Sequence, residues 1–233
     1  RLVEPELMGQ QWRADVEAFF HQPTGSLTYL VADPASRRAA VIDPVLDYDW
    51  KRARTSASFA EQILARIAER GLTVDWLLET HVHADHLSAA AWFKERTGAR
   101  TAIGTAVVKV QAEFIPLFDA RDLAPDGSAF DRLLDDGQRV QLGGIEIEVL
   151  AVPGHTPACV AYQVGDALFV GDTMFMPDLG TARCDFPGAD AAQLYRSLRR
   201  MLSLPDETRI VVCHDYPGPA RPEPAWETTV AAQ

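Results

Sequence analysis

The segment "ETHVHADHLSAA" (residues 79–90) places three histidines and one aspartate within six positions, from His81 to His86. The whole chain of 233 residues contains only six histidines, so half of them fall in this short stretch. A lone histidine is usually a surface residue or a hydrogen-bonded core residue, and we interpret His21 in that way. The pattern His-x-His-x-Asp-His instead predicts a cluster of ligands for a metal ion.

Three further polar residues lie just past the ends of predicted strands, as His81 does. His155 occurs in "VPGHT", Asp172 in "FVGDT" and His214 in "VVCHDY". Because strand ends at one edge of a sheet lie close together, we expect these distant segments to meet in one place. The segment after His81 is expected to be a short irregular loop, with Asp85 and His86 at the start of the following helix.

Strand and helix patterns alternate in two rounds along the chain. Helices are expected at 58–71, 87–98 and 190–204, the last with Asp190 as its N-cap, and a long loop at 116–137. Strands are expected at 26–32, 38–43, 74–80, 138–152 (a pair hinged at Gly143-Gly144), 158–172 (a hairpin around Gly165-Asp166) and 208–215. This order predicts an α/β fold in which two sheets pack together with helices outside.

Composition and charge narrow the class of protein. A hydrophobic content of 47% with 24% charged residues is ordinary for a soluble globular chain. The formal net charge of −11 argues against nucleic acid or an anionic membrane as the main partner. The start "RLVEPELMGQ" has no features of a signal peptide, and no apolar run approaches the ~18 residues of a spanning helix. The three cysteines form no CxxC pair, which favours a reducing, cytoplasmic location.

The motifs resemble those of a known family. "THVHADH", "VPGHTPACV", "VGDTMF" and "CHDY" are similar to the motifs of the metallo-β-lactamase superfamily, occur in the same order and cover nearly the whole chain. The longer segments "THVHADHLSAA" and "GDTMFMPDLGTARCDF" most resemble the persulfide dioxygenase branch and its bacterial hydrolase-like relatives. This resemblance implies an αββα sandwich of two mixed β-sheets flanked by helices. It also implies a single domain over residues 1–233, with a C-terminal tail that is absent or short.

The resemblance implies a mononuclear iron site. One Fe(II) ion would be held by His81, His155 and Asp172, a facial triad that leaves three positions open for substrate, O2 and water. The other motif residues would act in catalysis by orienting ligands and water, namely His83, Asp85, His86 and His214. The implied reaction converts glutathione persulfide, O2 and water to glutathione and sulfite. The expected partners are therefore a small thiol persulfide and O2, and a homodimer is left open.

The same seven residues can instead hold two zinc ions. In that arrangement, as in glyoxalase II, Asp172 bridges two sets of ligands: His81, His83 and His155, and Asp85, His86 and His214. Such a pair generates a hydroxide nucleophile that hydrolyses a thioester or a related acyl substrate. The residue types do not decide between the two arrangements, and only the surrounding motif favours iron. A non-catalytic metal-binding or sulfide-sensing protein is a third hypothesis, against which the complete ligand set argues.

The segment "TARCDF" supplies the candidate substrate residues. By resemblance Arg183 lies near the substrate, where a guanidinium suits an anionic thiol. The alternative is a structural ion pair of Arg183 with Asp178 or Asp185. Tyr195, in the helix expected at 190–204, is predicted to help line the pocket.

Two departures from the family pattern affect the substrate end of the site. The iron dioxygenases usually carry a Gly-Cys-Gly-Arg type of run where this chain has "DLGTARCDF", so we expect the substrate end to differ. The sequence also ends 19 residues after His214 (233 − 214), so we do not expect the helical substrate-binding domain of glyoxalase II.

Overall fold

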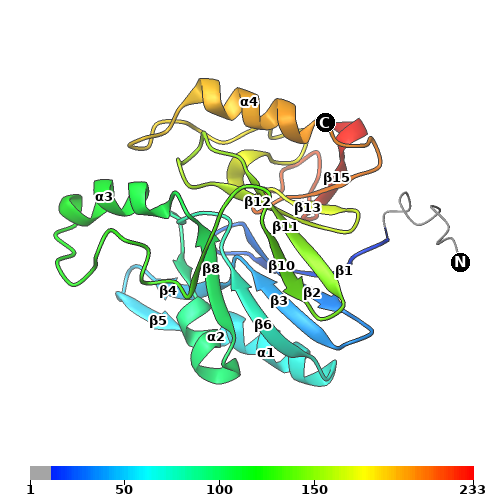
Figure 1. The fold of residues 1–233 in the computed structure, drawn as a ribbon, viewed down its shortest axis with the longest axis horizontal. Helices are drawn as coiled ribbons and strands as arrows, with labels where there is room; N and C mark the ends of the chain where they lie inside the picture. Colours follow the sequence, from blue (N-terminus) through cyan, green and yellow to red (C-terminus); the bar gives the residue numbers. More distant parts are fainter. Residues whose placement is uncertain (1–11) are drawn as a thin grey trace, which may run out of the picture.

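Two six-stranded β-sheets that lie face to face form the centre of the computed structural model, which describes residues 12–233 (Figure 1). The first sheet has the order β1-β2-β3-β6-β8-β9, antiparallel from β1 to β3 and parallel from β3 to β9. The second runs in chain order from β10 to β15 and is antiparallel except for the parallel pair β13 and β14. Helices cover the outer faces of both sheets, which confirms the predicted αββα sandwich.

The elements have the following bounds. The first sheet contains β1 (Asp15–His21), β2 (Ser26–Asp33), β3 (Arg38–Ile42), β6 (Thr73–Leu78), β8 (Arg100–Gly104) and β9 (Arg132–Leu134). The second contains β10 (Arg139–Leu142), β11 (Ile145–Ala151), β12 (Val160–Val164), β13 (Ala167–Phe169), β14 (Arg209–Val211) and β15 (Glu227–Thr229). A small third sheet contains β5 (Arg54–Ser56), β4 (Val45–Asp49) and β7 (Leu87–Ser88). The helices are α1 (Ser58–Glu69), α2 (Ala90–Thr97), α3 (Val107–Leu117) and α4 (Ala191–Met201), with short 3-10 turns η1 (Gly171–Thr173) and η2 (Val230–Ala232).

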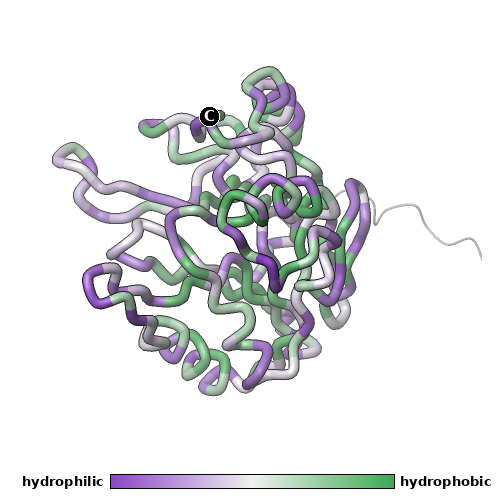
Figure 2. The backbone as a smooth tube through the Cα atoms, turned by 90° about the vertical axis from the view of Figure 1, so that its left-hand side faces the viewer, coloured by the Kyte–Doolittle hydropathy of each residue, from purple (hydrophilic) through white to green (hydrophobic). Residues whose placement is uncertain are grey.

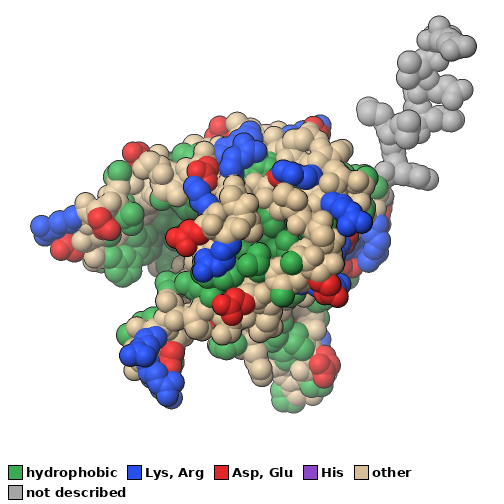
Figure 3. All heavy atoms as spheres, turned by 90° about the horizontal axis from the view of Figure 1, so that it is seen from below, with side chains coloured by type: hydrophobic (Ala, Val, Ile, Leu, Met, Phe, Trp, Pro, Cys, Tyr) green, Lys and Arg blue, Asp and Glu red, His purple; other side chains and the backbone are tan. Residues whose placement is uncertain are grey.

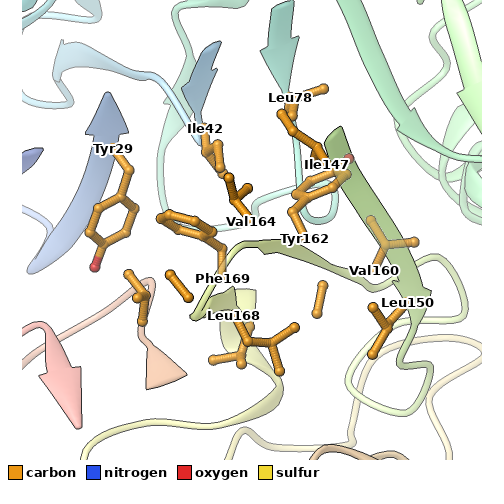
Figure 4. Close-up of a cluster of buried hydrophobic side chains, with 14 of the residues drawn as sticks. Tyr29, Ile42, Leu78, Ile147, Leu150, Val160, Tyr162, Val164, Leu168 and Phe169 are labelled. Atoms are coloured by element: carbon orange, nitrogen blue, oxygen red, sulfur yellow. The ribbon is translucent and has the colours of Figure 1, made fainter. Parts of the chain in front are cut away.

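The space between the two sheets is filled by buried apolar side chains. Ile42 and Leu78 from the first sheet point toward Ile147 and Phe169 from the second, and all four are fully buried (Figure 4). The tube coloured by hydropathy shows the same apolar interior (Figure 2). Burial of apolar surface stabilises a fold by roughly 25 cal/mol per Å². This central layer therefore holds the two sheets together, and with them the strand ends that carry the predicted site.

Helices α1, α2 and α4 each pack on the outside of the sandwich through one apolar face. On the outer face of the first sheet, Ile63 of α1 and Phe93 of α2 pack against Leu77. Over the second sheet, α4 buries Leu194, Ser197 and Met201. In contrast, α3 and the loop after it project from one side of the body (Figure 1).

The observed elements agree with most of the predicted ones. Asp190 is the N-cap of α4, as predicted, because its Oδ1 accepts hydrogen bonds from the backbone nitrogens of Ala192 and Gln193. The helix expected at 87–98 begins only at Ala90, because Leu87 and Ser88 form β7 against β4. Consequently Asp85 and His86 lie in a loop and not at a helix start. Helix α3 and strands β1, β4, β5, β7, β8, β9 and β15 were not predicted. The loop expected at 116–137 is interrupted by the end of α3 and by β9, which pairs with β8. The single domain over 1–233 stays a prediction.

Positive and negative side chains are interspersed on the face shown in Figure 3.

Among the helices of residues 12–233, none has both the length and the apolar character needed to cross a bilayer.

Gly154 lies where the turn after β11 packs closely against the start of α4. Its φ is +150°, and a Cβ at this position would lie 2.4 Å from the Cα and the backbone nitrogen of Leu194. Its carbonyl accepts a hydrogen bond of 2.9 Å from the backbone nitrogen of Asp190, the N-cap of α4. The turn that carries His155 is therefore in direct backbone contact with the first turn of α4.

We predict that Gly154→Ala lowers both stability and metal affinity. The strained φ alone should cost more than about 1 kcal/mol of unfolding free energy, and the contact with Leu194 must displace α4 or the turn with His155. Thermal unfolding and metal content measure the two effects. Gly218→Ala is the matched control, because its added Cβ meets no atom within 4 Å. Equal melting temperature and metal content in the two variants would contradict this account.

Candidate metal centre

Three of the predicted ligands meet at one edge of the sandwich. His81 follows β6, His155 follows β11, and Asp172 lies in η1 after β13. The Nε2 atoms of His81 and His155 lie 3.6 and 3.7 Å from Oδ2 of Asp172. All three residues are buried, and one ligand atom from each lies within 4.8 Å of the others.

The spacing and the ionisation of these groups fit a metal ion. Atoms bound at about 2.1 Å to one ion lie about 3.0–3.5 Å apart, close to the observed separations. Burial lowers the pKa of His81, which keeps the imidazole neutral. Burial alone would raise the pKa of Asp172, but the hydrogen bond from His214 and the nearby imidazole of His81 hold it well below its usual range. Neutral imidazole and ionised carboxylate are the forms that bind metals.

The remaining polar atom of each ligand is held by a neighbour. Nδ1 of His155 donates a hydrogen bond of 2.8 Å to the carbonyl of Arg183. Nδ1 of His81 lies 3.0 Å from Oγ1 of Thr80. Oδ1 of Asp172 accepts from Nδ1 of His214 at 2.6 Å. Hydrogen bonds of this kind orient ligands, and they leave both Nε2 atoms and Oδ2 free to face a metal.

His214 lies between two carboxylates. Its Nδ1 contacts Asp172, while its Nε2 lies 2.8 Å from Oδ2 of Asp85 and 3.0 Å from Oγ of Ser26. Burial alone would lower the pKa of His214, but the hydrogen bonds to Asp172 and Asp85 raise it to about 9. His214 and Asp85 therefore form an ion pair beside the triad in the metal-free protein.

His83 and His86 lie on the same loop with their rings stacked, 4.2 Å between centroids. Nε2 of His83 donates to Oδ1 of Asp43 at 3.2 Å, and Nδ1 of His86 donates to the carbonyl of Leu87. Nδ1 of His83 and Nε2 of His86 are buried without a hydrogen-bond partner within residues 12–233. Ligand atoms of His83, Asp85 and His86 lie within 4.8 Å of one another. These three residues can therefore hold a second cation beside the triad.

Sequence reasoning missed Asp43, Glu79 and Ser26, which contact the predicted residues. Asp43 could have been found by the argument used for His81, because it is a polar residue at the end of the strand predicted over 38–43. Glu79 directly precedes the motif and carries no pattern of its own. Ser26 begins β2 and gave no indication of its contact with His214.

A pocket of about 390 Å³ opens beside the triad and reaches Arg183. Its lining includes two triad members, His155 and Asp172, and the other side chains around it are Asp85, Phe175, Thr181, Arg183, Phe186, His214 and Tyr216. The guanidinium of Arg183 lies 4.5 Å from the ring centroid of Phe186. The pocket thus combines aromatic walls with the guanidinium of Arg183 at its edge.

Arg183 also forms one of the two ion pairs considered from the sequence. Its Nε lies 3.3 Å from Oδ1 of Asp185, and both side chains are mostly exposed. Asp178 is instead 3.2 Å from Arg221. An exposed pair of this kind contributes at most about 1 kcal/mol, so it leaves the guanidinium available to a ligand.

Tyr195 does not line the pocket, contrary to prediction. Its neighbours Leu194 and Ser197 occupy the buried face of α4, whereas Tyr195 is 64% exposed. Successive residues of an α-helix point about 100° apart, so a side chain next to Leu194 is directed away from the body.

The chain matches the model of the metallo-beta-lactamase superfamily over residues 21–214. It is 54% identical to a probable metallo-hydrolase of Burkholderia pseudomallei, over 86% of this chain and 72% of that protein. It is 50% identical to a beta-lactamase hydrolase-like protein of Xylella fastidiosa, over 94% of this chain but only 50% of that protein. It is 42% identical to glyoxylase B2 of Dictyostelium discoideum, over 95% and 76% of the two chains. The chain therefore spans about half the length of one of these relatives and about three quarters of the other two.

Two solved structures extend the comparison. ETHE1 from Myxococcus xanthus aligns with a TM-score of 0.74 and 32% identity, over 93% of this chain and 80% of that chain. TTHA1623, crystallised in a di-iron-bound form, aligns with a TM-score of 0.68 and 29% identity, over 93% and 96% of the two chains.

We predict that His81→Ala abolishes metal binding, because it removes one of three protein ligands. His83→Ala, Asp85→Ala and His86→Ala should keep most of the metal and lose about 10–100-fold in activity, as is typical when orienting residues are removed. Metal analysis per chain after anaerobic purification is the measurement, with His21→Gln as a histidine control outside both clusters. One metal per chain is expected in the parent protein. A content of two, reduced to one in Asp85→Ala or His86→Ala, would contradict the mononuclear site.

Proposed function

This chain belongs to the metallo-β-lactamase superfamily, and from that premise we propose that it is an iron-dependent persulfide dioxygenase. Its substrates would be glutathione persulfide and O2, and its products glutathione and sulfite. The likeness to ETHE1 and the similarity of "THVHADHLSAA" and "GDTMFMPDLGTARCDF" to the persulfide dioxygenase branch support this proposal.

The main support for this proposal is that the two carboxylate oxygens of Asp172 face different groups. Oδ2 faces His81 and His155, whereas Oδ1 accepts a hydrogen bond of 2.6 Å from His214. A carboxylate held in this way has one oxygen left to face a metal. That arrangement favours a facial triad of two imidazoles and one carboxylate, the ligand set of many non-haem iron oxygenases.

The roles of the other residues follow from their positions. Iron(II), held by His81, His155 and Asp172, would supply the redox chemistry for a reaction of O2 with a sulfur anion. Arg183 binds a carboxylate of the glutathione moiety, and Phe175, Phe186 and Tyr216 exclude water from the pocket. Oxidation of the persulfide to sulfite and glutathione consumes one O2 and one water and releases two protons. The pair Asp85 and His214 borders the pocket where these protons appear.

A dinuclear hydrolase is the second candidate. The unpartnered nitrogens of His83 and His86 favour it, because both could bind a further ion beside Asp85. The names of the Burkholderia and Dictyostelium relatives and the di-iron form of TTHA1623 also agree with it. Its substrate would be a thioester or a related acyl compound, and two metal ions held by these residues would supply the hydroxide nucleophile for hydrolysis. In either case the cytoplasmic location and the homodimer remain predictions.

We predict that the Fe(II) protein consumes O2 with glutathione persulfide and releases sulfite in equal amount. The zinc-loaded protein should be inactive in this assay, because zinc has no redox chemistry. An oxygen electrode and a sulfite assay on both forms provide the measurement. Hydrolysis of S-lactoylglutathione by the zinc form, with no O2 uptake by the iron form, would replace this proposal by the hydrolase.

We predict that Arg183→Ala raises KM for the persulfide about 10–100-fold, because a hydrogen bond to a charged group contributes about 1.5–3 kcal/mol. Metal content should not change, since only the carbonyl of Arg183 contacts His155. Asp185→Asn is the matched control, because it removes the ion pair and keeps the guanidinium. Unchanged KM in a folded Arg183→Ala variant, or the same rise in Asp185→Asn, would remove Arg183 from the substrate site.

A further inference from the structure

Glu79 is a buried carboxyl group that the proposed reaction does not use. Its side chain is 4% exposed and lies where β6 ends, two residues before His81. Oε1 accepts a hydrogen bond from Oγ of Ser88, while Oε2 is buried without a hydrogen-bond partner within residues 12–233. A buried polar atom without a partner costs about 1–3 kcal/mol. An apolar residue here would also leave Ser88 and His83 with one acceptor fewer, so the carboxyl group belongs to the buried polar contacts of the site.

The unpartnered oxygen faces His83. Oε2 of Glu79 lies 3.3 Å from Nε2 of His83, and Oδ1 of Asp43 lies 3.2 Å from the same nitrogen. One N–H group therefore points between two acceptors that come from different strand ends, β6 and β3. Asp43 is itself held by the backbone nitrogen and the hydroxyl of Thr80. With both acceptors in place, the His83 ring cannot rotate without losing an acceptor at Nε2.

Glu79 also joins the two ends of the loop that carries the histidines. Residue 79 precedes the loop, and Ser88, which donates to Glu79, ends it. The hydroxyl of Ser88 in turn accepts from the backbone nitrogen of Ala90, the first residue of α2. A single carboxyl group therefore fixes the far end of the loop with one oxygen and faces His83 with the other.

Resting on the proposed function, in which His83 orients ligands and water, we propose that Glu79 is a positioning residue that acts through His83. Its carboxyl group, opposite Asp43, holds the His83 ring beside that of His81, with the two ring centroids 4.1 Å apart, and leaves Nδ1 without a hydrogen bond to the protein. Glu79 does not touch the substrate pocket with Arg183. It lines a separate pocket of about 350 Å³ across the loop, together with His83, His86 and Lys94.

Steady-state kinetics of two variants test the role. Glu79→Leu has similar volume but no oxygen. We expect unchanged KM for the persulfide, unchanged iron content, a lower melting temperature because Ser88 and His83 lose an acceptor, and kcat lower by about 10–100-fold. Glu79→Gln keeps an oxygen for His83 and a polar group for Ser88, and should retain most of the parent kcat. Parental kcat in Glu79→Leu, or a loss confined to KM, would overturn the proposal.

The orientation of the His83 ring can be measured without turnover. In zinc-loaded protein labelled with 15N-histidine, the parent should show a slowly exchanging ring proton, assigned by its absence in His83→Gln. We expect this signal to persist in Glu79→Gln and to shift and exchange faster in Glu79→Leu. Ser88→Ala, which removes only the loop contact, should leave it unchanged. An unaffected signal in Glu79→Leu, or an equal effect in Ser88→Ala, contradicts the proposal. If the parent iron protein takes up no O2, the proposed function fails, while the ring signal still tests Glu79.

Discussion

The buried carboxylate of Asp43 is the contact on which the geometry of the site depends. It lies at the end of β3 in the first sheet and accepts hydrogen bonds from the nitrogen and the hydroxyl of Thr80, which precedes His81. It accepts a third from His83, and Sγ of Cys213, from the second sheet, lies 3.5 Å away. Burial alone would raise the pKa of Asp43, but the neighbouring His83 holds it below its usual value. One ionised group thus ties both sheets to the loop with the histidines.

The charges around the site are arranged in pairs, which makes their burial possible. A buried ion without a partner costs several kcal/mol, so each carboxylate must face a donor. Asp43 faces His83, and Asp172 and Asp85 face His214. In the metal-free protein the protons on His83 and His214 therefore supply positive charge, since contact with these carboxylates raises the pKa of both imidazoles. His81 lacks such a proton, because its burial lowers its pKa, and it is free to bind a metal.

The meeting of His81, His155, Asp172 and His214 at one edge could be predicted from the sequence because it follows from topology, whereas the choice of three of them as a triad came from the family resemblance. His81, His155 and Asp172 each follow a buried strand, and strands of packed sheets bring their ends to one edge. Tyr195 could not be placed in this way, because the face of a helix depends on what packs against it and not on its distance from a motif. Glu79 was not predicted as a site residue, for a different reason. Its importance comes from a contact with His83 four residues later, which exists only because the loop is irregular.

The loop of residues 81–88 lines two pockets, and the triad borders both, with His81 in one and His155 and Asp172 in the other. The pocket of about 390 Å³ contains Arg183 and the aromatic side chains, whereas the pocket of about 350 Å³ lies on the Glu79 side. Substitutions in the segment after η1 can therefore change the substrate without disturbing the residues that orient His83. Conversely, a change in the hydrogen bonds of Asp172 or His83 can alter the number of metals while the substrate pocket remains. Function in such a family depends on these few contacts and not on the sandwich that supports them.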